Sequence, residues 1–95
     1  MNSRELKNAV VLMFKYYPSQ YSEEELDRAS NRNRREIKRN FDEVLDAMPK
    51  EERRILKMEN IRHAQPDWWQ EYYSKSTYYR LRRKAHERFL EWIKR

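Results

Sequence analysis

The chain has 95 residues, of which 40% are charged and 14% aromatic, and its formal net charge is +6. This length suits one small domain and leaves little room for a second hydrophobic core. There is no cysteine, which excludes disulfides, thiolate metal sites and cysteine nucleophiles. The apolar run 9–14 is too short for a signal peptide or a membrane span, so we expect a cytoplasmic protein with no membrane partner.

The absence of glycine and of alternating β-branched runs predicts an all-α chain, a small bundle of about five to six helices. The first helix is expected over about 4–17, with Ser3 as its N-cap and Pro18 as its end. Its apolar face consists of Leu6, Val10, Met13 and Tyr17.

A second helix is expected to open at Ser22, which forms a capping box with Glu25. The apolar spacing then lapses, and we predict a break or bend near residues 30–34. Beyond it a helical face resumes and ends at Pro49. Its members are Ile37, Phe41, Val44, Leu45 and Met48.

Pro49 suits the first position of the next helix, which is expected to continue toward Pro66. The stretch "PDWWQEYY", 66–73, predicts a short aromatic helix. Ser74 is the expected cap of the last helix, which should run to about Lys94.

A single domain over residues 1–95 is therefore expected, in two parts. Residues 49–95 form the expected C-terminal part, and residues 1–48 form an N-terminal helical hairpin. The hairpin carries little net charge, and two roles stay open for it: pairing two chains as a homodimer, or completing the core of the C-terminal part.

Catalysis is not expected. His86 has no second histidine four residues away, so the spacing of a zinc-protease helix is missing, and His63 lies near a helix end. Both histidines are interpreted as structural. The paired acids occur at helix starts, where the helix dipole explains them. No enzyme activity, no metal and no cofactor is predicted.

The positive charge is concentrated at the C-terminal end. Residues 1–73 contain 14 basic and 14 acidic residues, whereas residues 74–95 contain 8 basic and 2 acidic residues. Such a basic element is typical of a protein that binds an anionic polymer. A second basic run, 28–39, is flanked by acidic stretches, so pairing or solvation is favoured over contact with DNA.

The rings of Trp68, Trp69, Tyr72 and Tyr73 could stack on bases. However, their spacing of one helical turn favours packing against the core, with the tyrosine hydroxyls at its rim.

Two segments carry a resemblance to a known family: "DAMPKEERRILKMENI" and "WWQEYYSKSTYYRLRRKAHERFLEWI". They resemble region four of bacterial sigma factors, in which a proline, acidic residues and aliphatics precede a helix-turn-helix with a basic recognition helix. Ser74, Ser76, Thr77 and Ala85 stand in register with that pattern. The chain more closely resembles small phage regulators of late-gene transcription of the ArpU and RinA type, over roughly residues 36–95. This resemblance implies that residues 49–95 are a helix-turn-helix DNA-binding part. The chain departs from these regulators at Tyr72 and Tyr73, where such modules often have glycine.

The last helix is predicted to dock through Tyr78, Leu81, Ala85 and Phe89 and to present its other side to a DNA major groove. Ser76, Tyr79, Arg80, Arg83 and Glu87 are then expected to face outward, with Arg82 and Lys84 on the flanks. The predicted DNA-binding residues are Lys75, Ser76, Thr77, Tyr79, Arg80, Arg82, Arg83 and Lys84.

These observations favour a sequence-specific double-stranded DNA-binding regulator of transcription, encoded by a phage or mobile element. Duplex DNA is its expected partner, and host RNA polymerase is a further candidate. Two alternatives stay open. One is a DNA-packaging protein similar to a small terminase subunit. The other is an interaction module or inhibitor that binds an acidic partner through residues 75–94.

Overall fold

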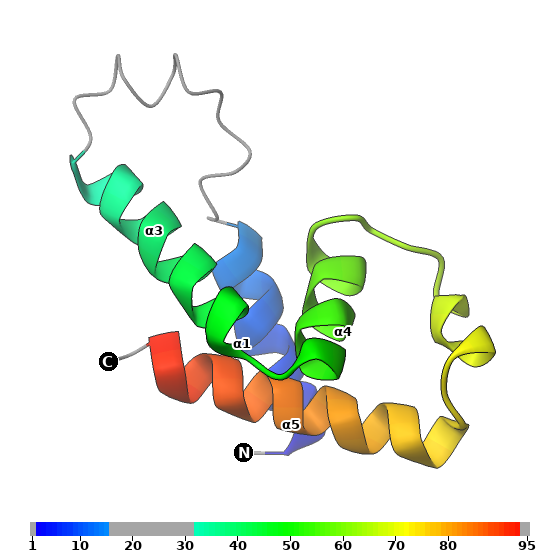
Figure 1. The fold of residues 1–95 in the computed structure, drawn as a ribbon. Helices are drawn as coiled ribbons and strands as arrows, with labels where there is room; N and C mark the ends of the chain where they lie inside the picture. The colour runs from blue at the N-terminus through cyan, green and yellow to red at the C-terminus, as the bar shows by residue number, and fades with distance from the viewer. Residues whose placement is uncertain (1, 16–31, 94–95) are drawn as a thin grey trace.

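The computed structural model describes residues 2–15 and 32–93, apart from the side chains of 32–35 and 37, and within these ranges every regular element is helical (Figure 1). The elements are α1 (Ser3–Lys15), α3 (Arg32–Ala47), α4 (Lys50–Asn60), the 3-10 helix η2 (Trp68–Glu71) and α5 (Lys75–Ile93). The predicted all-α class is confirmed. The described ranges contain four α-helices, fewer than the five or six predicted, and the helix expected from Ser22 lies outside them.

Helix α1 is capped by Asn2 and not by Ser3. Asn2 Oδ1 accepts a hydrogen bond of 2.9 Å from the Glu5 backbone N–H, and the Glu5 carboxylate accepts one of 3.0 Å from Asn2 Nδ2. This reciprocal pair satisfies groups at the helix start that would otherwise lack partners. The Ser3 hydroxyl is consequently available for a contact elsewhere.

Helix α3 begins at Arg32, so the break predicted near 30–34 is wrong for residues 32–34. Arginine is a good helix former, and a lapse of apolar spacing does not by itself interrupt a helix. The predicted apolar face is confirmed where side chains are described. Its buried members are Phe41, Val44, Leu45 and Met48.

Helix α4 starts one residue later than predicted and ends earlier. Pro49 is its N-cap, with φ −54° and ψ 143°, so the first helical residue is Lys50. The helix ends at Asn60, because the chain turns away through Ile61 and Arg62, whose amides both donate to the Lys57 carbonyl. His63 follows with a positive φ of 49°, a conformation that helices exclude.

The aromatic stretch forms one turn of 3-10 helix and not the predicted α-helix. Its local hydrogen bonds favour tight turns: Trp69 Nε1 donates to the Pro66 carbonyl at 3.0 Å, and the amides of Tyr72 and Tyr73 both donate to the Trp69 carbonyl at 2.9 Å. A segment confined between Pro66 and the cap at Ser74 has little length for α-helical turns.

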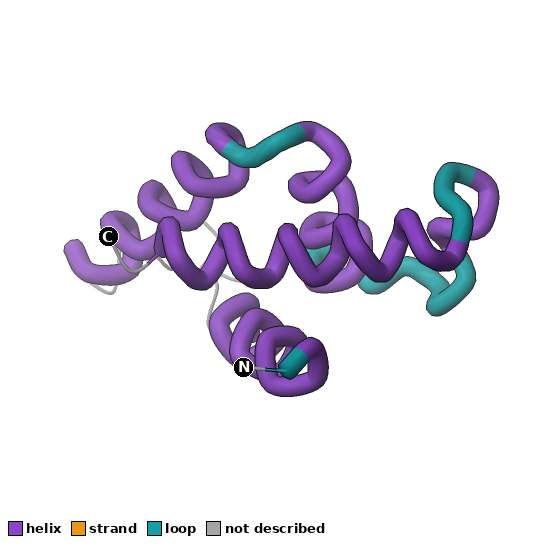
Figure 2. The backbone as a smooth tube through the Cα atoms, turned by 90° about the horizontal axis from the view of Figure 1, so that it is seen from below, coloured by secondary structure: helices purple, strands orange, loops and turns teal. Residues whose placement is uncertain are grey.

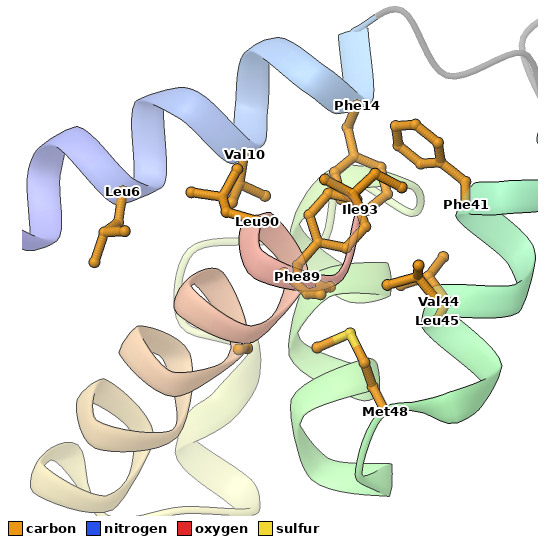
Figure 3. Close-up of a cluster of buried hydrophobic side chains, with 12 residues drawn as sticks. Leu6, Val10, Phe14, Phe41, Val44, Leu45, Met48, Phe89, Leu90 and Ile93 are labelled. Carbon is orange, nitrogen blue, oxygen red and sulfur yellow. The ribbon is translucent and has the colours of Figure 1, made fainter. Parts of the chain in front are cut away.

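Three phenylalanine rings from three helices meet at the centre of the core (Figure 3). Phe14 of α1 and Phe89 of α5 are stacked with centroids 5.0 Å apart, and Phe41 of α3 lies edge-on to them at 5.5 and 5.4 Å. Such ring pairs add about 0.5–1.5 kcal/mol each beyond the burial of their area. The rings therefore join the N-terminal helices to α5 in one core.

Helix α5 is the element against which α1, α3 and α4 all pack, and it crosses the molecule in front of α3 and α4 when seen from below (Figure 2). Its buried face differs from the predicted stripe. Leu81 is only half-buried, whereas three residues outside that stripe are buried: His86, Leu90 and Ile93. The reason is α1, which packs alongside α5 and widens the face that α5 buries.

None of the helices in the described ranges combines the length and hydrophobicity that crossing a bilayer demands.

Candidate nucleic-acid interface

The start of α5 is fixed by the predicted cap. Ser74 Oγ accepts a hydrogen bond of 3.3 Å from the Thr77 amide and donates one of 2.8 Å to the Thr77 hydroxyl. An N-terminal Ser cap of this kind contributes about 1 kcal/mol. Thr77 thus helps to close the first turn, and Lys75 and Ser76 project from that turn as exposed side chains.

Beyond the cap, the first three turns of α5 present an exposed basic surface. Lys75, Arg80 and Lys84 are exposed and make no ion pair with a residue of the described ranges. Tyr79 is 48% exposed beside them. We call these residues, with Ser76, the α5 basic surface. The structure therefore brings together five of the eight predicted site residues.

Arg82 belongs to the interior of the fold. Its Nε lies 3.1 Å from Glu59 of α4, and its side chain is only 20% exposed. The Tyr78 hydroxyl donates to the same carboxylate, and the Arg82 guanidinium lies 5.9 Å from the centre of the Tyr78 ring. Burial, followed by the Glu59 carboxylate, raises the pKa of Tyr78 above its ordinary value. Arg82 thus neutralises a partly buried carboxylate.

Arg83 is exposed but engaged on two sides. Its Nε donates to Glu87 at 2.8 Å, and its Nη1 donates to Ser3 Oγ of α1 at 2.6 Å. Sequence reasoning placed Arg83 on an open outward face. In the folded chain, α1 reaches that face.

Acidic side chains occupy the second half of the same helix face. Glu87 and Glu91 are exposed there, and Arg88 lies 3.1 Å from the buried Glu52 of α4. Within α5, positive charge without a partner in the described ranges is therefore restricted to residues 75–84. An anionic ligand would therefore be attracted most strongly to the N-terminal half of α5, where cations lack an acidic partner in the described ranges.

The aromatic residues before α5 form a separate cluster that supports its first turns. Trp69 stacks on Tyr78 with centroids 4.5 Å apart and an interplanar angle of 6°, and Trp68 packs edge-on to Tyr78 and Tyr73. The Tyr73 hydroxyl donates to Glu51, and burial followed by that carboxylate raises the pKa of Tyr73. Tyr72 remains exposed, under the guanidinium of Arg54. Most of the cluster is thus packed within the protein, and Tyr72 lies at its edge.

The two histidines lie in opposite environments. His63 is exposed in the turn after α4, whereas His86 is 3% exposed in α5. Burial, with smaller contributions from the charges of Arg82 and Lys7, lowers the pKa of His86 to about 4. Neither histidine joins a cluster of potential metal ligands within the described ranges.

The second basic run, 28–39, lies partly outside the described residues. Of its members with a described side chain, Arg39 is exposed and Lys38 lies 4.0 Å from Asp42 one turn later. That contact is the weak surface pairing expected from the flanking acids.

The contacts of Arg82 and Arg83 were not foreseen from the sequence. Glu59 lies 23 positions from Arg82, and Ser3 lies 80 positions from Arg83. No periodic pattern links residues at such separations. The one available signal was the apolar face of α1, which indicated packing against some partner but not which one.

Comparison with known proteins gives no match: no family model, no curated protein and no solved structure is detectably similar to this chain.

Proposed function

We propose that the chain is a sequence-specific double-stranded DNA-binding regulator of transcription that inserts the N-terminal half of α5 into the major groove. The observation that carries the proposal is the α5 basic surface. Its three cations have no acidic partner in the described ranges, while the opposite end of the same helix is fixed in the core.

The dimensions of this surface fit the groove. Lys75 and Lys84 are nine residues apart, which places them about 14 Å apart along the helix and on opposite sides of it, at about 100° per residue. The major groove of B-DNA is about 12 Å wide. The two lysines therefore suit phosphates on its two edges, and Arg80 between them suits a base edge, for which guanine is the usual partner of arginine.

The residues of the predicted site then divide into two groups. Ser76, Tyr79 and Arg80 are the candidates for base contacts, and Lys75 and Lys84 for phosphate contacts. Thr77, Arg82 and Arg83 are instead proposed to hold the helix in position, through Ser74, Glu59 and Ser3 respectively.

We further propose that α4, the link 61–74 and α5 act together as a helix-turn-helix. In that unit η2 takes the place of the scaffold helix, and its rings brace α5 at Tyr78. The resemblance to small phage late-gene regulators supports transcription as the process, with host RNA polymerase as a second partner. A DNA-packaging role and binding to an acidic protein are the alternative outcomes of the test.

Selection of bound duplexes from a random pool tests the proposal directly. We expect one enriched sequence, bound at least tenfold more tightly than its scrambled version, as each mismatched base pair typically costs about 1–3 kcal/mol. Arg80→Ala should reduce the preference for the enriched sequence. Arg4→Ala, which removes an exposed cation from α1, outside the proposed helix-turn-helix, is the matched control and should leave this preference unchanged.

Equal affinity for enriched and scrambled duplexes would reject sequence-specific regulation and favour packaging. If duplexes fail to bind at low salt while an acidic protein is retained, the interaction module would replace the DNA proposal.

A further inference from the structure

A cleft separates α1 from the aromatic cluster beside α5. Its volume is about 350 Å³, within the usual range for small-molecule sites. Its lining comes from α1 through Lys7 and Val11, from the loop after α4, from Trp68 and Trp69, and from Glu59 and Arg82. The cleft lies apart from the three cations of the α5 basic surface and shares only Tyr79 with it.

The shape and lining of this cleft favour a flat ring. Pro66, Trp69 and Tyr79 contribute apolar or aromatic surface to the lining, and Val11 of α1, which is 47% exposed, lines the same cleft. The Tyr79 ring is held by an edge contact with Tyr78 at 5.3 Å and by Trp69 at 6.2 Å, yet remains half exposed. A planar ligand could therefore stack on Tyr79 without displacing a packed side chain.

The charges around the cleft leave a positive excess. The Glu59 carboxylate is matched by the Arg82 guanidinium and also accepts the Tyr78 hydroxyl. Lys7 has no ion-pair partner in the described ranges. The effect of this charge is visible at His86, whose pKa is lowered by burial and then by Arg82 and Lys7. An anion would be attracted to the part of the cleft lined by α1.

We propose that this cleft is a binding site for a planar aromatic anion, which stacks on Tyr79, contacts Trp69 at its edge and pairs its charge with Lys7. Two sources share this chemistry, a free aromatic acid and a nucleotide. The proposal is independent of DNA recognition by α5, because neither Lys7 nor Trp69 belongs to the α5 basic surface.

Nuclear magnetic resonance on the full chain provides a test with an internal control. The indole N–H signals of Trp68 and Trp69 report on the cleft, whereas Trp92 packs against the core and should not respond. The probes are 2-naphthoate and adenosine monophosphate, for the two sources, with neutral 2-naphthamide and aliphatic cyclohexanecarboxylate as controls. We expect saturable shifts of Trp68 and Trp69 with a Kd of about 1 mM or tighter for at least one aromatic anion.

Variants separate charge from shape. Lys7→Met should raise the Kd of the aromatic anion by about tenfold, because one favourable charge contact is lost. Lys15→Met removes an exposed lysine two turns along α1 and should leave the Kd unchanged. Tyr79→Ser should weaken binding of naphthoate and adenosine monophosphate alike. The absence of saturable shifts at about 10 mM ligand, or equal affinity for cyclohexanecarboxylate, would overturn the proposal.

Discussion

The guanidinium of Arg83 in α5 donates a hydrogen bond of 2.6 Å to Ser3 Oγ in α1, joining two residues 80 positions apart in the chain. The contact is available because Asn2, and not Ser3, caps α1. It links the N-terminal helix to the middle of the helix that carries the basic surface. Because Arg83 also pairs with Glu87 at 2.8 Å, it is less available to phosphates than its position in the sequence suggests.

The first prediction concerns the dependence of duplex affinity on salt. Counting all basic residues of the last helix suggests five or six phosphate contacts and a slope of about −5 for log K against log [salt]. Lys75 and Lys84, the two candidates for phosphate contacts, alone predict a slope of about −2. Filter-binding titrations over a series of salt concentrations would measure it.

Lys84→Ala should then reduce the magnitude of that slope by about one, because one phosphate contact is removed. A slope near −5 for the unaltered chain would mean that Arg82 and Arg83 leave Glu59 and Ser3 when DNA binds. A slope of −1 or shallower would contradict insertion of α5 into the groove.

The second prediction separates two neighbouring arginines. Arg82→Ala leaves the partly buried Glu59 carboxylate without its cation, so the free energy of unfolding should fall by about 1–3 kcal/mol. Arg80→Ala removes an exposed cation and should change the free energy of unfolding by less than about 0.5 kcal/mol. Urea unfolding followed by circular dichroism provides the measurement.

Affinity for the selected duplex should show the reverse order. Arg80→Ala is expected to weaken binding by about 1–3 kcal/mol, whereas folded Arg82→Ala should retain most of its affinity. The opposite result would be unchanged affinity for Arg80→Ala and a large loss of affinity for a fully folded Arg82→Ala protein. Arg82 would then be the DNA contact, and Arg80 would not.

The third prediction concerns pH. His86 has a pKa of about 4 in the folded chain, because burial and nearby cations oppose its charged form, against an ordinary value of 6.5. The unfolded chain therefore binds more protons between these two values, and stability must fall as the pH is lowered through that window. Between pH 7 and pH 5 the loss should be about 2 kcal/mol.

His86→Gln provides the control, since glutamine does not titrate. Its free energy of unfolding should vary much less over the same range than that of the unaltered chain. If both proteins lose the same stability between pH 7 and pH 5, another group is responsible for the dependence.

The fourth prediction distinguishes the observed face of α5 from the predicted one. Phe89 is fully buried and contacts Phe14 and Phe41. Phe89→Ala should therefore lower the free energy of unfolding by about 3–5 kcal/mol. Leu81 is only half-buried. The loss of unfolding free energy caused by Leu81→Ala should therefore be smaller than the roughly 2–5 kcal/mol typical of core leucines. Equal losses for the two variants, measured by urea unfolding, would show that the sequence-based stripe was correct.

The helical class and several helix boundaries could be predicted because they depend on local chemistry. Proline and serine act within one turn of their own position, and Ser74 caps α5 as expected. The apolar face of α3 was equally readable, since its spacing of three and four residues is itself the helical period. The aromatic stretch was misread because periodicity does not distinguish one 3-10 turn from a short α-helix.

Which basic residues of α5 pair with carboxylates could not be predicted, because this pairing depends on contacts between distant segments. Six basic residues of α5 look alike in the sequence. Arg82, Arg83 and Arg88 are paired with carboxylates, whereas the other three have no carboxylate partner among the residues that the structure describes. Glu52 and Glu59 come from α4, and their alignment with α5 follows from the packing of the two helices. The burial of His86 has the same origin, since it requires α1 to lie against α5.

The meeting of Phe14, Phe41 and Phe89 has a consequence for how the chain opens. Each ring belongs to a different helix, so no one of these three helices can detach without breaking the shared ring contacts. Amide protons in the middle of α1, α3 and α5 should then exchange with deuterium through one common opening, with similar free energies. The turn at 61–67, which carries His63, does not take part in these contacts. It should exchange faster and leave the three helices undisturbed.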